Sequence, residues 1–393
     1  MCPFSSQASE HLIKSLWQEY PMIIPELHLV HHSLPCAFFL EAMASNDLSP
    51  EQQTFFVETS RMLMLSADAS QVQVCPTKFA AVCRKFKDVL VQRGLARQAV
   101  LPLQSAVAKL QVDPSALTPL HGDLLQACLV SKFYRVGADH LYPGNDADQK
   151  NLVVGDPKVT GLTVRDFLLY CYYGGMILVG EKRFEESTDF FLKAFTVPAM
   201  ALSAIMIASF KKYLLVCLLL HGVVTPIPEY TSQVVQRSIG AYCSEYLEFA
   251  KAYSTYETQK LEEILAKHEA IFSKDHNLGL VKQCLPSLRK RVVQRLTQTY
   301  LTLSLEDLST KGQVAEAEAL LLRMIESKEI VAKISQKDQM VVFPDEDTSS
   351  LETSLQHQIN RAIKLGAQVE ELDESLMVNR VFLQNTAIRG EQV

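Results

Sequence analysis

The feature that most constrains the fold is a short β pattern in a chain that otherwise has helical periodicity. Two apolar runs, 329–334 and 340–343, flank the polar residues 335–339. Apolar residues alternate along both runs, which predicts two strands joined by a turn. One side of the first strand is expected to carry Ile330, Ala332 and Ile334. The facing side of the second strand is expected to carry Met340 and Val342.

Two helices are predicted just before this hairpin. Ser304 and Asp307 have the spacing of a capping box, which satisfies backbone amides at the start of a helix. A stripe of apolar residues then repeats every three or four positions from Val314 to Ile325. Two helices and a hairpin in so short a segment predict a winged helix. A small winged helix that closes a long helical array is typical of a subunit of a larger assembly.

The composition favours a large and mainly helical protein. The chain has 393 residues, of which 48% are hydrophobic, so it can bury a core in more than one domain. Its 15 glycines and 16 prolines are few for this length, which favours helices over an all-β sandwich. A net charge of −6 gives no general field that would attract nucleic acid.

Cysteine spacing and hydropathy exclude several other classes of protein. The 9 cysteines include no C-x-x-C pair, which indicates buried free thiols in a reducing compartment. The N-terminus lacks a basic start followed by an apolar core, so no signal peptide is expected. The most apolar stretch, 199–220, is interrupted by Lys211 and Lys212 and therefore predicts a core helix rather than a membrane span.

Helical hairpins follow one another through most of the chain. Residues 166–198 have the small and large positions of one degenerate tetratricopeptide repeat. Gly174 and Gly175 each weaken a helix by about 1 kcal/mol, and close helix contact is the expected compensation. One hairpin cannot bury its own apolar face, so we expect stacking into a right-handed superhelix. Further helices are predicted at 200–220, 231–252, 260–272 and 278–301.

The first part of the chain is harder to divide. Four prolines indicate that helices within 1–75 are short. Helical periodicity improves over 77–141, and the polar stretch 142–161 is expected to be a loop. The four prolines are Pro21, Pro25, Pro35 and Pro50.

The predicted domain organisation of the whole chain is N-terminal repeats at 1–165, further repeats at 166–287, a winged helix at 288–343, a linker at 344–350, a helix at 351–380 and a tail at 381–393.

The last predicted helix has more apolar surface than a small winged helix can cover. Ser349 and Glu352 form a second capping box at its start. From 351 to 376 the helix would be about 39 Å long, so we expect its outer part to pack against other chains. Its apolar stripe consists of Leu351, Leu355, Ile359, Ile363, Val369, Leu372 and Leu376, with Gly366.

The hairpin offers a second candidate contact surface. As an outer strand, residues 340–343 would have unpaired backbone groups, and Val341 and Phe343 would be exposed on the face away from Met340 and Val342. Such an edge is protected when another chain pairs with it. The alternative is that Phe343 folds back onto its own winged helix.

No catalytic constellation emerges from the sequence. Adjacent residues such as His31 and His32 diverge on a helix, and there is no H-E-x-x-H or H-x-H motif, so a zinc protease is not expected. There is no G-x-S-x-G elbow for nucleophilic catalysis and no glycine-rich phosphate loop. Neighbouring acidic residues on predicted helices are interpreted as solvated faces. We expect neither an enzyme nor a cofactor or metal site.

Nucleic-acid binding is the main alternative for a winged helix. The recognition helix would lie at about 313–327, and its charged residues are mostly acidic, which would repel phosphates. A basic run lies one helix earlier, between Arg289 and Arg295. It could contact an acidic partner or RNA, but a solvated helix face is the favoured interpretation.

Helical repeats that end in a winged helix are the architecture of the PCI family, found in the proteasome lid, the COP9 signalosome and eukaryotic initiation factor 3. This sequence resembles that family and, more specifically, the subunit 3 family of the COP9 signalosome. The runs that carry the resemblance are YCYYGGMILVG (170–180), TVPAMALS (196–203), KKYLLV (211–216), YTSQVVQR (230–237), DHNLGLVKQCLPSL (275–288), RLTQTYLTLSLEDL (295–308) and MIESKEIVAKISQKDQMVVF (324–343).

The resemblance implies a non-catalytic scaffold in the complex that removes Nedd8 from cullins in cullin–RING ubiquitin ligases. It implies association of winged helices edge to edge and a shared bundle of C-terminal helices. The expected partners are the other PCI-type and MPN-type subunits, with cullin–RING ligases as indirect partners, in the cytoplasm and nucleus. No membrane partner is expected, and the isopeptidase would belong to another subunit. The alternatives are a subunit of the proteasome lid or initiation factor 3, and an RNA- or DNA-binding PCI protein.

Overall fold

The computed structural model describes residues 15–142, 152–156, 160–312, 317–343 and 348–378. The chain divides into two compact units, residues 1–288 and 289–393. In the described residues of the first unit, the regular structure is helical apart from one isolated bridge between Ala116 and Val153. The described residues of the second unit form the end of α17, a three-stranded sheet, two short helices and a long final helix. The mainly helical fold class predicted from the sequence is confirmed.

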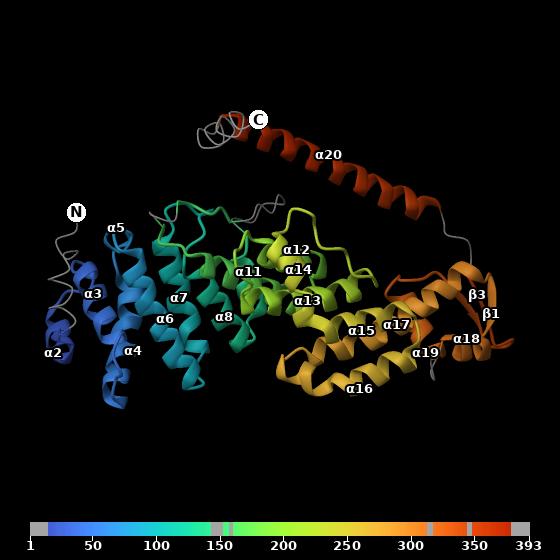
Figure 1. Ribbon diagram of the computed structural model, residues 1–393, viewed down its shortest axis with the longest axis horizontal. Helices are drawn as coiled ribbons and strands as arrows, with labels where there is room; N and C mark the ends of the chain where they lie inside the picture. The colour runs from blue at the N-terminus through green and yellow to red at the C-terminus, as the bar shows by residue number, and fades with distance from the viewer. Residues whose placement is uncertain (1–14, 143–151, 157–159, 313–316, 344–347, 379–393) are drawn as a thin grey trace. The chain divides into compact units, whose positions relative to one another are not determined.

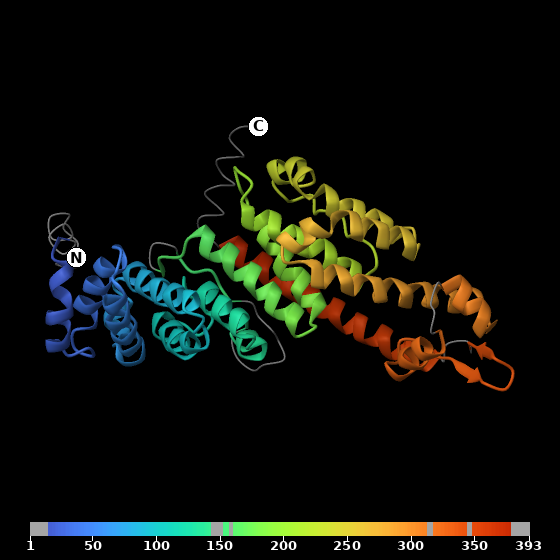
Figure 2. The ribbon, with the colours of Figure 1, turned by 90° about the horizontal axis from the view of Figure 1, so that it is seen from below.

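The first unit is an array of helices in which neighbours along the chain pack together. Figures 1 and 2 show α11, α12 and α13 side by side, and each contacts the next. The helices of this unit are α2 (Tyr20–Ile23), α3 (Ser33–Ala44), α4 (Pro50–Ser66), α5 (Ala69–Val72), α6 (Pro76–Gln92), α7 (Arg97–Leu110), α8 (His121–Ser131), α9 (Tyr134–Asp139), α11 (Val164–Gly180), α12 (Phe184–Thr196), α13 (Ala204–Leu220), α14 (Gln233–Ser238), α15 (Ser244–Ser254), α16 (Thr258–Lys274) and α17 (Leu278–Thr299), which extends into the second unit. Short 3-10 helices occur at Trp17–Glu19, Ile24–Glu26 and Ala241–Cys243.

The predicted hairpin at 166–198 is confirmed as α11 and α12. Thr163 caps α11 in a capping box with Asp166. The turn to α12 places Lys182 in the left-handed region, with φ of 61°. In that turn the amide of Arg183 donates to the carbonyl of Leu178 at 2.9 Å, which closes the helix end as a Schellman motif.

Helix α12 joins two hydrophobic cores of the first unit. Phe190 packs into the core formed by the helices before it, whereas Phe191 packs into the core formed by α13 and α15 to α17. Both side chains are at least 98% buried. Because adjacent residues of one helix serve different cores, the array is continuous through α11 and α12.

Two expectations about helix lengths are wrong. Helix α4 has 17 residues, because Pro50 occupies its first position and Ser49 caps it with Gln52, so the proline starts the helix instead of shortening it. The helix predicted at 231–252 is divided into α14, a 3-10 turn and α15. Gly240 lies at this division, where its low helix propensity weakens the continuation. Much of the loop predicted at 142–161 falls outside the described residues.

The second unit contains the predicted winged helix. Its elements after α17 are β1 (Thr302–Ser304), α18 (Leu305–Gly312), α19 (Ala317–Glu326), β2 (Lys333–Ser335), β3 (Met340–Val342) and α20 (Thr348–Val378). The amide of Asp307 donates to Oγ of Ser304 at 3.0 Å, which confirms the predicted cap at the start of α18. Of the predicted helical stripe, Ala317, Leu321 and Met324 are buried, and Val314 lies outside the described residues.

The cysteines are free thiols wherever the structure describes them. Seven of these eight cysteines are buried and Cys75 is half-buried. Burial raises the pKa of the Cys171 thiol to about 12, so it stays protonated and unreactive at neutral pH. The prediction of buried free thiols is confirmed for these residues.

Candidate functional site: the winged helix and the C-terminal helix

Strand β3 is the central strand of the sheet, whose order is β1–β3–β2. Both neighbours are antiparallel to it, with Val341 opposite Leu303 on one side and Ile334 on the other. The expectation that 340–343 forms an outer strand with unpaired backbone groups is therefore wrong. The reason is the third strand, β1, which is too short and too polar to show a period-two pattern in the sequence.

The side chains of Val341 and Phe343 belong to the core of the winged helix. Val341 is fully buried and Phe343 is 4% exposed, in a cluster with Leu303 and Met324. The amide of Phe343 also donates to the carbonyl of Leu301 at 2.8 Å. The expectation that these two side chains are exposed is wrong, and the alternative that Phe343 packs on its own winged helix is confirmed.

The remaining predicted hairpin residues divide between the core and the opposite face of the sheet. Ile330 is buried and Ile334 is half-buried against the same core. Met340 is half-buried, and Val342 is 40% exposed on the other face. The predicted register of the hairpin is wrong by one residue. Ile334 lies opposite Val341, whereas the prediction placed it on the same face as Met340 and Val342.

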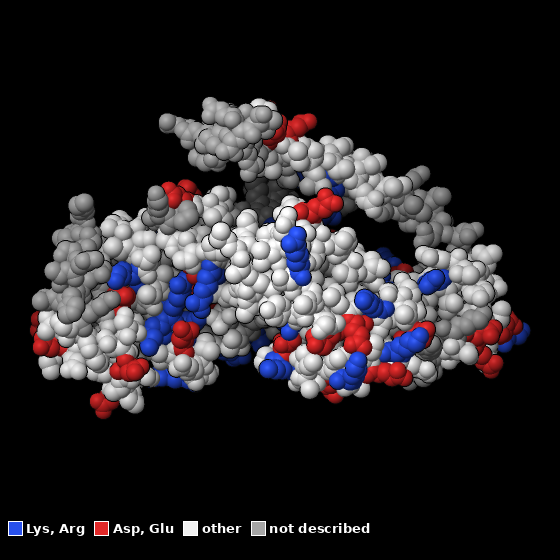
Figure 3. Space-filling view, in the orientation of Figure 1, with Lys and Arg blue, Asp and Glu red and all other residues white. Residues whose placement is uncertain are grey.

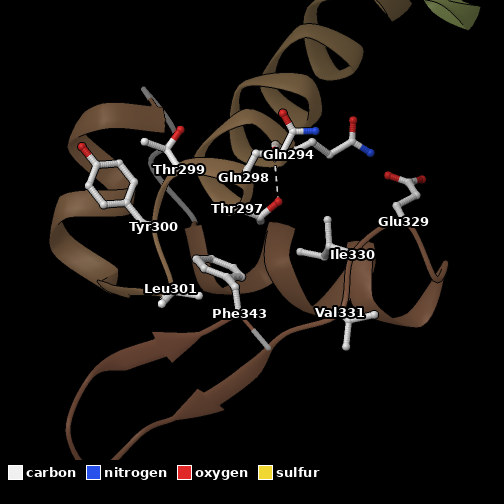
Figure 4. A pocket seen from close by; sticks show the side chains of 10 residues that line it. All are labelled: Gln294, Thr297, Gln298, Thr299, Tyr300, Leu301, Glu329, Ile330, Val331 and Phe343. Carbon is white, nitrogen blue, oxygen red and sulfur yellow. Dashed lines mark hydrogen bonds between the residues drawn. The ribbon is translucent and has the colours of Figure 1, made fainter. Parts of the chain in front are cut away.

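Two apolar side chains that were not predicted from the sequence, Leu301 and Val331, are exposed next to the sheet. Both line a cavity of about 410 Å³ between the end of α17 and the segment before β2, shown in Figure 4. The other lining side chains are Gln294, Thr297, Gln298, Thr299, Tyr300, Glu329, Ile330 and Phe343. This lining of amides, hydroxyls and apolar groups, with a single carboxylate, suits contact with a peptide surface better than acid–base chemistry.

Among the described residues of the second unit, helix α20 carries most of the exposed large apolar side chains. Its 31 residues give a length of about 46 Å at the usual rise per residue. The exposed members of the predicted stripe are Leu355 (49%), Ile359 (51%), Ile363 (66%), Val369 (64%) and Leu372 (61%). The side chains of Leu351 and Leu376 lie outside the described residues. A continuous apolar stripe of this length is unusual on a surface that only contacts water.

The charges of the winged helix do not form a basic surface. Glu318 and Glu326 flank Arg323 on α19, and Glu318 accepts a hydrogen bond from Gln336 at 2.8 Å. Of the basic run on α17, Lys290 pairs with Glu329 at 2.6 Å. The acidic residues on either side of Arg323 give α19 no electrostatic advantage for approaching phosphates. In the first unit, on the face drawn in Figure 3, basic and acidic side chains are likewise interspersed around α16.

Neither a metal centre nor a membrane span is found in the described parts of the chain. No three His, Cys, Asp or Glu side chains there are grouped so that they could hold a metal ion. Within the same residues no helix combines the length and the apolar character needed to cross a bilayer.

Comparison with known proteins assigns the family. Residues 1–235 match the family described as COP9 signalosome complex subunit 3, N-terminal helical repeats, and residues 265–345 match the PCI domain. The chain belongs to the COP9 signalosome subunit 3 family. A relative named COP9 signalosome complex subunit 3 from Arabidopsis thaliana is 36% identical over 92% of this chain and 83% of its own length. One from Dictyostelium discoideum is 31% identical over 93% of this chain and 87% of its own length.

Membership of the subunit 3 family confirms the resemblance seen in the sequence. It also extends the resemblance, because the match begins at residue 1, whereas the runs that carry the resemblance begin at residue 170. The PCI match ends at residue 345, so helix α20 follows it.

Proposed function

We propose that this chain is a non-catalytic scaffold subunit of a COP9 signalosome in the cytoplasm and nucleus, the complex that removes Nedd8 from cullins. It binds the other PCI-type and MPN-type subunits and reaches cullin–RING ligases through them. The observation that carries the proposal is the exposed apolar stripe of α20, from Leu355 to Leu372. An amphipathic helix of this length is suited to a bundle with similar helices from sister subunits.

The winged helix supplies a smaller second contact. Its outer strands, β1 and β2, have three residues each, and Lys333 on β2 is exposed. Strands this short offer few backbone groups for edge pairing, and a lysine discourages it. We therefore assign the winged-helix contact to the exposed apolar side chains Leu301, Val331 and Val342, and most of the assembly energy to α20.

Affinity purification of the tagged full-length chain tests the proposal. The test variant is Leu355→Gln with Ile359→Gln and Ile363→Gln. Glutamine keeps helix propensity while removing the stripe. The matched control changes exposed residues of the polar face, Asn360→Gln with Glu371→Gln and Ser375→Gln. Mass spectrometry of the eluates is expected to find signalosome subunits with the wild type and the control and at least tenfold less with the stripe variant.

Two outcomes would contradict the proposal. If the stripe variant recovers sister subunits at the level of the control, α20 is not the assembly surface. If the wild type recovers proteasomal ATPases or ribosomes in place of signalosome subunits, the chain works in another PCI assembly. Circular dichroism of the purified variants confirms that helical content is retained, so that loss of partners is not loss of folding.

A further inference from the structure

Helix α13 places a lysine inside the first unit. Lys212 is 6% exposed, and its Nζ lies 5.9 Å from the centroid of the Tyr172 ring. The one hydrogen-bond acceptor that the described residues provide for this ammonium is Oδ1 of Asn277, at 2.5 Å. A lysine ammonium has three donors, and a buried one is normally paired with a carboxylate.

The nearest carboxylate is engaged by other groups. Oδ2 of Asp275 accepts from Nζ of Lys211 at 2.7 Å and from the Tyr246 hydroxyl at 2.8 Å. Nδ2 of Asn277 donates to the same Tyr246 oxygen at 2.9 Å. Asp275 is therefore paired with Lys211, and no described carboxylate lies within 4 Å of Lys212, although two ammonium groups and one carboxylate make up the cluster. The cluster has one positive charge in excess.

The turn between α16 and α17 fixes these polar groups in place. His276 adopts the left-handed conformation, with φ of 55°, so that Asp275 and Asn277 on either side of it reach α13. The amide of Asn277 donates to the carbonyl of Phe272 at 2.9 Å, which closes α16. The polar groups are thus held by backbone geometry and do not need a ligand to arrange them.

A cavity of about 250 Å³ opens beside Lys212. The cavity has room because two residues one turn apart on α13, Ala204 and Ala208, have small side chains. Its apolar wall is completed by Ile207 and Tyr172. The polar wall consists of Lys211, Lys212, Asp275 and Asn277. An apolar enclosure with a few convergent polar groups is the usual construction of a site for a small group.

We propose that this cavity binds a carboxylate, which accepts hydrogen bonds from Nζ of Lys212 and supplies the counter-charge that the cluster lacks. A single carboxylate matches the one excess positive charge, whereas a phosphate would bring more negative charge than the cluster can balance. The carboxylate belongs either to an acidic side chain of a protein partner or to a small free acid. Burial, opposed by the charge of Asp275, lowers the pKa of Lys212 to about 8, as expected for a buried charge without a directly bound counter-ion.

Carbamylation by cyanate measures occupancy of the site in the full-length chain, because only the neutral amine reacts. A carboxylate next to Lys212 raises its pKa by about one unit, so the rate of modification near pH 7.5 should fall about tenfold. The probes are acetyl-Gly-Glu-Gly-amide, compared with acetyl-Gly-Gln-Gly-amide, and sodium acetate, compared with sodium chloride and sodium phosphate at equal ionic strength. Peptide mapping measures the extent of carbamylation of Lys212 relative to that of the exposed Lys251.

The outcomes separate the two sources and test the site itself. Protection by the glutamate peptide at lower concentration than acetate assigns the site to a protein side chain, and the reverse assigns it to a small acid. Protection by neither, equal protection by phosphate, or no reaction of Lys212 in the free chain would each overturn the proposal. In Asn277→Asp an internal carboxylate should slow the reaction about tenfold without any ligand and abolish further protection. Lys260→Met, a change of surface charge away from the cavity that keeps the Lys251 reference, should leave protection intact.

Discussion

Gly175 of α11 lies against the ring of Phe191 on α12, so closely that a Cβ at position 175 would stand 2.7 Å from Cε1 of Phe191. The hydroxyl of Ser187 donates to the carbonyl of Gly175 at 3.0 Å and fixes the same contact. Gly174 has the same relationship to Phe190, at 2.9 Å. Close packing between α11 and α12 therefore compensates for the low helix propensity of the two glycines, as predicted from the sequence.

Gly175→Ala should lower the free energy of unfolding of the first unit by about 1–3 kcal/mol, because the added methyl group forces a fully packed ring to move. Thermal denaturation followed by circular dichroism measures the effect. Gly279→Ala is the control, since nothing lies within 4 Å of a Cβ built there. A loss of stability at position 279 equal to that at 175 would show that packing on Phe191 is not the cause.

Adjacent valines of β3 should respond very differently to truncation. Val341→Ala removes methyl groups from the core of the winged helix and should destabilise it by about 2–3 kcal/mol. Val342→Ala, on the exposed face, should cost less than about 1 kcal/mol. Amide hydrogen exchange of the β3 amides in the full chain measures both. Equal costs would contradict the register that places Val341 opposite Ile334.

Two aspartates contact the buried ammonium of Lys87, and they should differ in importance. Asp123 is 8% exposed and lies 2.8 Å from Nζ, whereas Asp88 is 56% exposed and lies 3.1 Å away. Asp123→Asn leaves Lys87 and Arg84 without their shared buried carboxylate and should cost about 3 kcal/mol. Asp88→Asn should cost less than about 1 kcal/mol. Urea denaturation of the two variants measures the difference, and the reverse order would refute this assignment.

The depressed pKa of Lys212 predicts that stability rises with pH. Burial, opposed by the charge of Asp275, lowers this pKa from its ordinary value to about 8 in the folded chain. Between pH 8 and roughly 10.5 the unfolded chain therefore binds more protons at this site, so the free energy of unfolding should rise by about 3 kcal/mol across that window.

The difference between the wild type and Lys212→Met isolates this effect, since both chains contain the neighbouring Lys211, Asp275, Tyr172 and Tyr246. Urea denaturation at several pH values is the measurement. A difference in unfolding free energy that stays constant from pH 7.5 to 10.5 would show that Lys212 keeps its ordinary pKa.

Local patterns in the sequence predicted the helical hairpin of α11 and α12, the Ser304 cap of α18, the tight contact at Gly175 and the apolar stripe of α20. These features depend on residues within one or two turns of each other, so periodicity and capping chemistry suffice to predict them. The hairpin of β2 and β3 was predicted for the same reason.

Only the tertiary structure decided which side of that hairpin is buried. Strand β1 precedes β3 by more than 30 residues, and its pairing makes β3 central and places Val341 inside and Val342 outside. Because side chains alternate along a strand, a shift of one residue reverses every face, and no local pattern fixes that choice. The cluster around Lys212 depends in the same way on Asn277, which is 65 residues away in the chain and hydrogen-bonded in the fold.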